Sequence, residues 1–489
     1  MENVDVVIVG AGITGIGAGY YLTTRFPTHS FAILEGRDAI GGTWDLFRFP
    51  GIRSDSDLFT FGFGFKPWTS DKSIAKADLI LDYLHETTRE HDLARHIRFG
   101  HRVVGARWSS EDARWTVTAE HAGEQIEFRC RFLVGGTGYY DYAQGYAPDF
   151  EGIEEFAGTV VHPQFWPQDL DYAGKRVVVI GSGATAATIV PAMAGIAAHV
   201  TMLQRTPSYM LSLPEEDPVH KAMKRVLGQQ RTYGITRRRY IWVQRAIYRA
   251  SRRYPRLMRR LLIADARRRL PKGFDVAAHF NPPYDPWDQR MCIVPGGDIY
   301  EAISSGDASV VTDHIDRFTP AGIRLRSGRV LEADIVVTAT GLRMLPLGGM
   351  ALSVDGADVD LPERTVYKSM MLSGVPNFAF VVGYENASWT LKVDLVCEHL
   401  CRLIAYMDTR GFDSVVPVRD DADSERLPLF DLTSGYVQRG IGAFPHMCSH
   451  GPWTFEQAYE VDVERLAGPV DSPELRFQTR IGTESPVAA

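Results

Sequence analysis

Two short runs of valine and isoleucine, each ending in a glycine-rich turn, constrain the fold of this chain more than any other feature. The first run, residues 6–9, leads into Gly10-Ala-Gly12-Ile-Thr-Gly15, and the second, residues 177–180, leads into Gly181-Ser182-Gly183-Ala184-Thr185-Ala186. Unbroken Val/Ile runs are typical of strands buried on both faces of a parallel sheet. A strand, such a turn and a helix form the dinucleotide-binding unit of Rossmann-like domains. The sequence therefore predicts an α/β protein with two Rossmann-like dinucleotide-binding domains.

Each glycine of the first turn has a separate task in holding a dinucleotide. Gly10 permits the tight turn, Gly12 lets a pyrophosphate approach the backbone, and Gly15 allows the helix to pack closely on the sheet. The helix N-terminus adds positive potential for the phosphates. Glu35 ends the next expected strand, residues 31–35, where its carboxylate can accept hydrogen bonds from ribose hydroxyls. Strand, turn, helix and acid together make a specific signature, whereas a lone GxGxxG motif is a weak one.

The second turn repeats this design, with alanine in place of the third glycine. The next expected strand, residues 200–204, is followed by Arg205-Thr206 and has no acid at its end. An arginine at this place can pair bidentately with the 2′-phosphate that distinguishes NADPH from NADH. We therefore expect NADPH at the second site; the alternative is a surface arginine unrelated to the nucleotide.

Two nucleotide sites in one chain indicate a flavin that is reduced by a nicotinamide. Disulfide reductases share that plan, but they need a redox-active cysteine pair soon after the first nucleotide motif, and no cysteine here precedes Cys130. The five cysteines are few and scattered, which is typical of a reducing compartment. Cys397 and Cys401 are four residues apart in a helical pattern, and we interpret them as two small core residues rather than a redox pair.

The length of the chain, 489 residues, is too great for a single core. A third apolar run at residues 335–337 ends in Ala339-Thr340-Gly341, and we interpret the chain as two doubly wound domains, the second inserted into the first. The expected division is an FAD-binding domain over residues 1–145 and 373–489, an NADP-binding domain over residues 150–212 and 285–372, and a helical subdomain over residues 213–284.

The expected helical subdomain is crowded with arginine, and its apolar residues recur at helical spacing. It is either a solvated helical surface or a patch for weak peripheral contact with a membrane or an acidic partner. Tyr240 and Trp242 within it, and Trp389 beyond it, are candidates for substrate pocket walls or for ordinary core packing. The tail after Asp471 is expected to be loosely ordered.

Bulk properties exclude several classes of partner. A net charge of −7 gives no global attraction for nucleic acid. The chain starts directly with a strand pattern, without the features of a secretory signal, and no apolar run approaches the length of a membrane-spanning helix. His446 and His450 flank Cys448 without a further ligand cluster. We therefore expect a cytoplasmic protein that binds neither nucleic acid nor metal.

Further motifs resemble those of the type I Baeyer–Villiger flavin monooxygenases. Residues 156–167, FAGTVVHPQFWP, match the FxGxxxHxxxWP fingerprint of that family, and related N-oxygenating enzymes usually carry Phe or Tyr in place of Trp166. Residues 41–55 fit its GGxWxxxxYPGxxxD pattern, with Phe49 as a variant, and Gly136-Thr-Gly138 and Ala339-Thr-Gly341 resemble its hinge-strand motifs. The similarity runs nearly end to end and is closest to the ethionamide-activating branch.

This resemblance implies roles for individual residues. Arg290 matches the active-site arginine and Asp55 the carboxylate that orients it, with a structural salt bridge as the alternative. His162 and Trp166 match the linker that couples domain motion to catalysis. Gln289 stands where longer members often carry a lysine near the 2′-phosphate. The positions that match the FAD side are Thr14, Glu35, Thr43, Trp44, Asp45 and Val103; those on the NADP side are Arg53, Ser54, Asp55, Ser182 to Ala186, Arg205 and Thr206.

The function that the resemblance implies is an FAD- and NADPH-dependent Baeyer–Villiger monooxygenase. It would use O₂ and a flavin C4a-peroxide to convert a small apolar ketone to an ester or lactone, and would also oxidise thioethers to sulfoxides. A fixed guanidinium at Arg290 suits that reaction because it stabilises anionic oxygen. The alternatives are an N- or S-oxygenase, against which Trp166 and Arg290 argue, and a non-catalytic flavoprotein sensor, which has no use for Arg290 beside Asp55.

Overall fold

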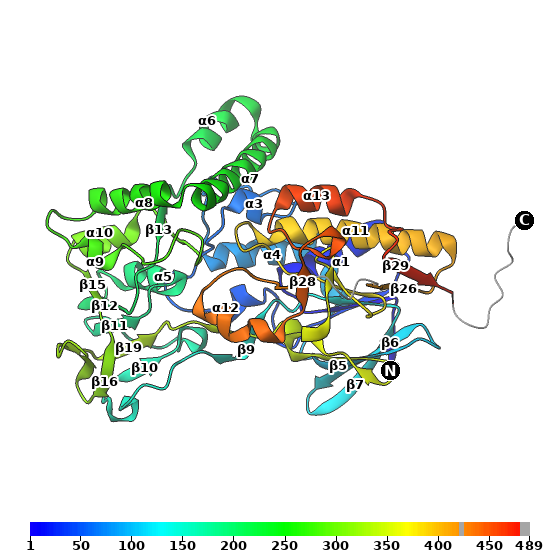
Figure 1. Cartoon of the computed structure of the whole chain (residues 1–489), viewed down its shortest axis with the longest axis horizontal. Helices are drawn as coiled ribbons and strands as arrows, with labels where there is room; N and C mark the ends of the chain where they lie inside the picture. The colour runs from blue at the N-terminus through cyan, green and yellow to red at the C-terminus, as the bar shows by residue number, and fades with distance from the viewer. Residues whose placement is uncertain (420–424, 480–489) are drawn as a thin grey trace, which may run out of the picture.

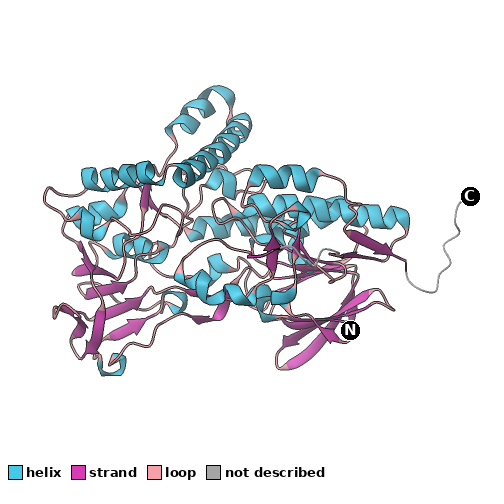
Figure 2. Cartoon of the chain, in the orientation of Figure 1, coloured by secondary structure: helices cyan, strands magenta, loops and turns pink. Residues whose placement is uncertain are grey.

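The computed structural model describes residues 1–419 and 425–479. The molecule is elongated, and its two parallel sheets lie in opposite halves (Figure 1). Most helices lie along one long side and most strands along the other (Figure 2). Each of the two glycine-rich turns predicted from the sequence directly follows the middle strand of one of these sheets.

The first sheet has five parallel strands in the order β25-β8-β2-β3-β4. Every residue of its three central strands is buried, as expected for strands covered on both faces. Because one edge strand comes from far along the chain, both ends of the sequence build this sheet. The strands are β2 (Val6–Val9), β3 (Phe31–Leu34), β4 (Ile97–Arg98), β8 (Phe132–Gly135) and β25 (Phe378–Phe380).

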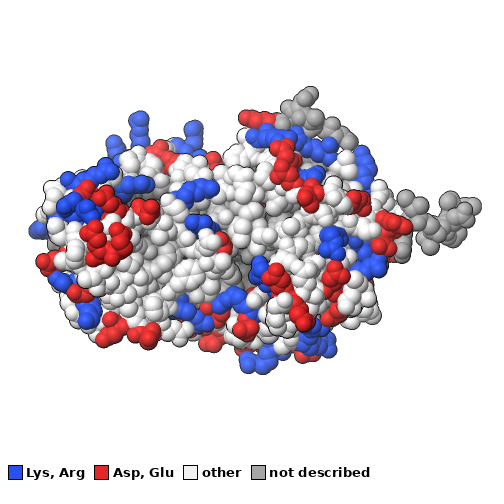
Figure 3. All heavy atoms as spheres, turned by 90° about the horizontal axis from the view of Figure 1, so that it is seen from below, with Lys and Arg blue, Asp and Glu red and all other residues white. Residues whose placement is uncertain are grey.

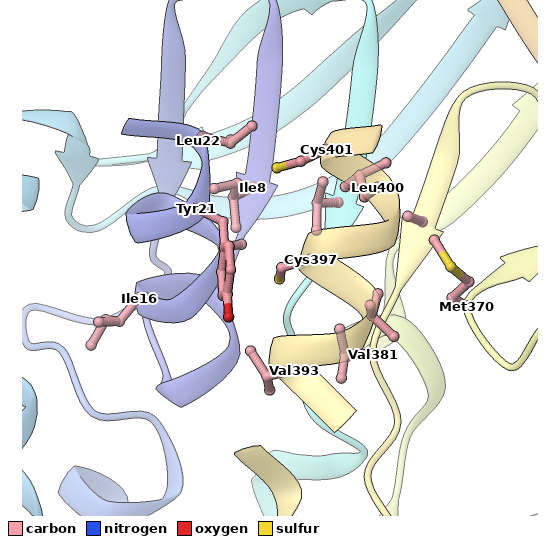
Figure 4. Packing of buried hydrophobic residues seen from close by; sticks show 14 of the residues in the cluster. Ile8, Ile16, Tyr21, Leu22, Met370, Val381, Val393, Cys397, Leu400 and Cys401 are labelled. Atoms are coloured by element: carbon pink, nitrogen blue, oxygen red, sulfur yellow. The ribbon is translucent and has the colours of Figure 1, made fainter. Parts of the chain in front are cut away.

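Helices α1 (Ile13–Arg25) and α11 (Trp389–Arg410) pack against each other over this sheet. Figure 4 shows the contact, in which Cys397 and Cys401 of α11 lie among apolar side chains that include Ile8 and Leu22. All five cysteines are buried, and Cys397 and Cys401 carry free thiols. Cys397 and Cys401 are therefore core residues, as the sequence indicated.

The second sheet is also parallel, in the order β10-β19-β11-β12-β15. Its helices include α5 (Ala184–Met193) and α10 (Asp298–Ser304), which pack on each other. The chain enters this sheet after β8 and leaves it before β25, so the second Rossmann-like unit is inserted into the first, and the predicted fold class is confirmed. The strands are β10 (Thr159–Val161), β11 (Arg176–Ile180), β12 (His199–Gln204), β15 (Ala308–Thr312) and β19 (Ile335–Thr338).

A six-stranded mixed sheet, which the sequence analysis did not predict, adjoins the first parallel sheet. Its centre is a meander of long antiparallel strands, and its order is β1-β7-β6-β5-β21-β22. It buries Trp108 and Trp115 in a core shared with the first parallel sheet. The strands are β1 (Glu2–Asn3), β5 (Arg102–Ser109), β6 (Arg114–His121), β7 (Glu124–Cys130), β21 (Ala351–Val354) and β22 (Ala357–Asp358).

The arginine-rich segment is helical, as predicted. It consists of α6 (Pro218–Leu227), α7 (Gln229–Arg253), α8 (Pro255–Arg269) and the short α9 (Val276–His279). Within the described residues, none of the helices combines the length and the apolar character that crossing a membrane requires.

The expectation of a loosely ordered tail after Asp471 is wrong for residues 475–478. Strand β29 (Leu475–Gln478) pairs antiparallel with β26 (Ser414–Pro417), and the buried Leu475 joins the core around α1 and α11. This strand has only four residues and follows the short polar stretch 471–474, so the sequence did not indicate it. Residues 480–489 lie outside the described part of the chain.

Candidate active site

The first glycine-rich turn is shaped by packing at two of its glycines and by open space at the third. Gly10 has φ +98°, and a Cβ on Gly15 would lie 1.8 Å from the Gly10 carbonyl oxygen, so both positions need glycine. A Cβ on Gly12 would make only an ordinary contact, 3.7 Å from Gly42 Cα. Gly12 is also the N-cap of α1, without a side-chain cap. The protein itself does not require glycine at position 12, whereas a pyrophosphate approaching the helix N-terminus would.

The second turn repeats this arrangement. Gly181 has φ +138°, and a Cβ there would lie 2.3 Å from the Ala339 carbonyl oxygen. A Cβ on Gly183 would meet no atom within 4 Å, although Gly183 is the N-cap of α5. Both turns therefore fit a dinucleotide phosphate at the N-terminus of the helix that follows.

Glu35 is buried at the end of β3, beside the first turn. One carboxylate oxygen accepts the Ala11 N–H at 2.7 Å and the other accepts the Arg37 N–H at 2.9 Å. Burial raises the pKa of Glu35, while these two backbone donors act in the opposite direction. Each oxygen can accept one more hydrogen bond, so the carboxylate fits two ribose hydroxyls.

The short helix α2 (Thr43–Leu46) lies against the first turn, since Gly42 is next to Gly12. The Thr43 hydroxyl lies 3.0 Å from the Tyr142 hydroxyl, an interaction that no local sequence signal indicated. Asp45 accepts a hydrogen bond from Arg37 Nη2 at 2.6 Å and also pairs with Arg48.

Two other residues predicted on the FAD side lie near apolar neighbours. The Trp44 ring meets Phe61 edge-on, with centroids 5.6 Å apart. Val103 is buried in β5 where the strand register shifts. Neither contact tests a role in FAD binding, which stays a prediction for both residues.

Arg290 and Asp55 form the ion pair that the sequence predicted. Arg290 Nε lies 3.1 Å from Asp55 Oδ2, and 28% and 34% of their side chains remain exposed. The Asp55 charge raises the pKa of Arg290, against the effect of burial. In the part of the chain that the structure describes, the two terminal nitrogens of Arg290 have no hydrogen-bond acceptor, so they are available to a ligand.

Three partly buried tyrosines lie near Arg290, and the sequence analysis did not single them out. Tyr139 and Tyr140 meet edge-on with ring centroids 4.5 Å apart, and Tyr436 lies beside Tyr140 at 6.4 Å. Burial raises the pKa of all three phenols, which are therefore neutral next to the guanidinium. Asp55 is thus the anion in direct contact with Arg290.

Trp389 links this tyrosine cluster to the first glycine-rich turn. Its ring packs on Tyr139, with centroids 5.4 Å apart, and its Nε1 donates a hydrogen bond to the Thr14 hydroxyl at 2.8 Å. The Arg290 pair and the N-terminus of α1 therefore belong to one connected site. Trp242, the other tryptophan considered for the pocket, is 71% exposed on α7.

The residues expected on the NADP side gather around the second turn. The Ser182 hydroxyl donates to the Thr206 carbonyl at 2.8 Å and lies 2.9 Å from the Ser208 hydroxyl, which joins the turn to the segment after β12. Arg205 in that segment is exposed and has no ion pair with any described residue. Its guanidinium is therefore available to a phosphate.

The loop that carries Asp55 reaches the second domain through Arg53. This side chain pairs with Asp298 of α10 and approaches the Ala187 carbonyl of α5 at 3.5 Å. The neighbouring Ser54 hydroxyl instead donates to the Ser56 carbonyl at 2.8 Å, within the loop. Gln289, which precedes Arg290, is partly exposed and forms a backbone bridge with Pro286.

The remaining candidates have structural partners. His162 Nε2 lies 3.3 Å from the Gly341 carbonyl, which connects the FxGxxxHxxxWP segment to the end of β19. His446 contacts the Thr365 hydroxyl at 2.8 Å and the Pro362 carbonyl at 3.0 Å. Among residues 1–419 and 425–479, no group of three or more His, Cys, Asp or Glu is placed to hold a metal ion.

Comparison with known proteins identifies the family. A family model described as flavin-binding monooxygenase-like matches residues 71–227, and one described as an NAD(P)-binding Rossmann-like domain matches residues 8–71. The chain is 50% identical to the FAD-containing monooxygenase EthA of Mycobacterium tuberculosis over 481 residues, 98% of each chain. It is 46% identical to the probable FAD-binding monooxygenase AlmA of Acinetobacter baylyi over 486 residues, 99% of this chain and 97% of AlmA.

Solved structures show the same fold at lower identity. Oxidized steroid monooxygenase bound to NADP superposes with a TM-score of 0.77 at 22% identity, covering 98% of this chain and 100% of that one. The open structure of cyclohexanone monooxygenase gives 0.77 at 20% identity with the same coverage. The predictions of a flavin monooxygenase, of FAD and of an NAD(P)-binding Rossmann-like domain are confirmed. This chain belongs to the family of FAD-containing monooxygenases.

Proposed function

We propose that this enzyme is an NADPH-dependent Baeyer–Villiger monooxygenase, which inserts one oxygen atom of O₂ into a small apolar ketone to give an ester or lactone. The ion pair between Arg290 and Asp55 is the observation that carries the proposal. A ketone carbonyl acquires negative charge on oxygen when a nucleophilic oxygen adds to it. A fixed cation with free donors at that place stabilises the charge.

The cofactors would supply the redox chemistry: bound FAD activates O₂, and NADPH provides the electrons. Arg290 stays cationic at any working pH because Asp55 raises its pKa. Since Asp55 engages Nε, the two terminal nitrogens remain available as donors to a ligand. The neutral tyrosines near the pair add no second negative charge beside Arg290.

The two glycine-rich turns would hold the cofactors. The N-terminus of α1, Thr14 and Glu35 fit FAD, with Thr43, Trp44, Asp45 and Val103 around it. The N-terminus of α5 and Ser182 fit the NADPH pyrophosphate, with Arg53, Ser54 and Gln289 nearby. Arg205, exposed and without an ion pair, fits the 2′-phosphate and supports NADPH over NADH.

Thioether oxidation belongs to the same proposal. Sulfur accepts oxygen without forming a carbonyl-derived oxyanion, so a pocket that admits a ketone should also oxidise a thioether of similar shape. The structure of cyclohexanone monooxygenase with ε-caprolactone bound superposes on this chain with a TM-score of 0.72 at 22% identity. That this fold binds a lactone there supports the proposal that the present enzyme acts on ketones.

A matched pair of substrates tests the proposal. The purified holoenzyme is incubated with NADPH, O₂ and either phenylacetone or methyl phenyl sulfide, and products are identified by mass spectrometry. We expect an ester from the ketone and a sulfoxide from the thioether. An amine N-oxide as the only organic product across a substrate panel would refute the Baeyer–Villiger assignment. The cytoplasmic location stays a prediction.

A further inference from the structure

The outer surface of helices α6, α7 and α8 combines positive charge with exposed apolar side chains. Residues 218–269 contain seventeen lysines and arginines and one acid, Asp265, in a chain with a net charge of −7. Of the fourteen large apolar side chains that are exposed in the described part of the chain, eight lie on or between these helices. They are Val219, Val226, Leu227, Ile235, Trp242, Tyr254, Leu257 and Leu261. We call the exposed residues of α6–α8 the basic helical surface.

Helix α7 is anchored by its inner face, which leaves its outer face free. On the inner face, the Tyr233 hydroxyl donates to the Phe59 carbonyl at 3.0 Å, and Arg237 Nη1 donates to the Gly62 carbonyl at 2.6 Å. Gln244 Nε2 donates to the Asp57 carboxylate at 2.5 Å. Residues three, four and seven apart share one face of a helix, so a second set of exposed residues forms the outer stripe. That stripe is Arg231, Ile235, Arg238 and Trp242, and it continues through Arg249, which pairs with Glu460, to Arg253.

The protein neutralises only part of the charge of the basic helical surface: the exposed Arg249, Arg252 and Arg268 pair with Glu460, Asp288 and Asp265. Two less exposed arginines of α7 also have carboxylate partners: Arg245 pairs with Glu460 at 2.6 Å, and Arg237, on the inner face, pairs with Asp394 at 3.4 Å. Seven outer arginines are exposed and make no ion pair with a described residue; they are Arg225, Arg231, Arg238, Arg253, Arg256, Arg260 and Arg267.

The position of the three helices leaves this surface accessible. They form one edge of the molecule, the upper one in Figure 1, with α6 projecting beyond the rest. The face seen in Figure 3, from the opposite side, carries basic and acidic side chains interspersed. Excess positive charge is therefore a property of the helical edge and not of the whole surface.

We propose that the basic helical surface docks on a bilayer that contains anionic phospholipid. Guanidinium groups would contact lipid phosphates, while Trp242, Leu257 and Leu261, each more than half exposed, enter the boundary between headgroups and acyl chains. Nucleic acid also offers phosphates but has no apolar phase for Val226, which is 82% exposed. A second copy of the same surface is repelled by its like charge.

Co-sedimentation of the full-length holoenzyme with vesicles tests this docking. Vesicles of phosphatidylcholine alone are compared with vesicles that contain one part phosphatidylglycerol to two parts phosphatidylcholine. We expect binding to the anionic vesicles only, and release when NaCl is raised to about 0.5 M, since salt shortens the range of the attraction. Brominated acyl chains should quench tryptophan fluorescence of the wild type more than that of Trp242→Leu.

Two variants separate the charged and apolar parts of the surface. Each basic side chain near an anionic membrane contributes about a fivefold factor in affinity, so Arg231→Gln/Arg238→Gln/Arg253→Gln should lower the partition coefficient about a hundredfold. Leu257→Ser/Leu261→Ser should lower it about tenfold. The matched control is Arg89→Gln/Arg326→Gln/Arg329→Gln, which removes the same charge from exposed positions elsewhere and should bind as the wild type does. FAD content and circular dichroism show that each variant is folded.

Three outcomes would overturn the proposal. The first is equal sedimentation with neutral and anionic vesicles, and the second is an equal loss of binding in the control. The third is that the protein binds duplex DNA but not anionic vesicles, and that the DNA binding is salt-sensitive and lost in the arginine variant. This third result would assign the surface to nucleic acid.

Discussion

Arg290 Nε lies 3.1 Å from Asp55 Oδ2, although the two residues come from distant parts of the chain. Asp55 belongs to the loop before α3 (Leu58–Phe61), and Arg290 lies two residues before the start of β14 (Cys292–Pro295). The same loop holds Arg53, which pairs with Asp298 in the other half of the molecule. One loop therefore orients the guanidinium and also connects the two nucleotide-binding units, so the proposed reaction depends on how these units are placed.

Replacing Arg290 should separate cofactor reduction from oxygen transfer. In Arg290→Ala we expect ester formation to fall at least about a hundredfold, because a preorganised donor to the developing oxyanion is lost. NADPH should still bleach the flavin, since the Arg290 side chain is not needed to bind FAD. Stopped-flow absorbance measures the reduction, and chromatography measures the ester. Arg326→Ala, an exposed arginine elsewhere, is the control; an ester yield near that of the wild type in Arg290→Ala would remove this residue from the mechanism.

Arg205 should determine the preference for NADPH. The loss of one charge-assisted contact with the 2′-phosphate costs about 1.5–3 kcal/mol, or one to two decades in affinity. The KM for NADPH should therefore rise by that factor in Arg205→Ala, while the KM for NADH, which has no 2′-phosphate, stays nearly constant. Steady-state kinetics with both cofactors checks this. If both constants rise equally, Arg205 has a structural role only.

Glu385 should make the stability of the protein depend on pH. Burial raises the pKa of Glu385 from 4.5 to about 7, so between these values the folded state binds more protons than the unfolded state. The free energy of unfolding then decreases as pH rises through this window. Glu385→Gln removes the penalty and should be stabilising at pH 8, by at most about 3 kcal/mol, and much less so at pH 5.

Thermal unfolding at both pH values tests the Glu385 prediction. Glu154→Gln, at an exposed position, serves as the control and should leave both melting temperatures unchanged. Equal shifts of Glu385→Gln at pH 5 and pH 8 would contradict the assigned cause.

The buried ion pair between Lys392 and Asp462 should hold α13 (Tyr459–Ala467) on α11. Lys392 Nζ lies 2.7 Å from Asp462 Oδ2, with 0% and 2% of the side chains exposed. Lys392→Ala leaves the buried carboxylate with only the more distant Arg465, at 3.9 Å, as a cation and should lower the free energy of unfolding by about 3 kcal/mol. The double variant Lys392→Met/Asp462→Leu leaves no unpaired charge and should recover most of that loss in urea titrations. Equal destabilisation of both variants would mean that lost packing, and not the unpaired charge, causes the decrease in stability.

The sequence predicted those parts of the fold that have a local pattern. The valine runs before Gly10 and Gly181 mark central strands because only strands buried on both faces are apolar without interruption. The strand at residues 475–478 and the mixed sheet around Trp108 lack such a pattern, since their strands alternate or are short. Their pairing depends on contacts with distant segments.

The candidate site likewise contains residues that could be placed from the sequence and residues that could not. Glu35 and Arg205 stand at fixed distances from their glycine turns, so their places follow from the sequence. Arg290 and Asp55 were assigned through a family resemblance, because nothing local joins them. Tyr139 and Tyr436 come together only when the chain folds, and no spacing marks either of them.

An experiment with labelled oxygen tests whether the enzyme inserts an oxygen atom of O₂ into a ketone and whether this step needs Arg290. The holoenzyme is incubated under ¹⁸O₂ in ordinary water with NADPH and phenylacetone, in parallel with the Arg290→Ala variant. We expect the wild type to give an ester that carries one ¹⁸O atom, and the variant to consume NADPH without forming labelled ester. Labelled ester from both proteins at similar rates would contradict the role of Arg290, and a wild type that makes no labelled ester from any ketone would contradict the proposed reaction.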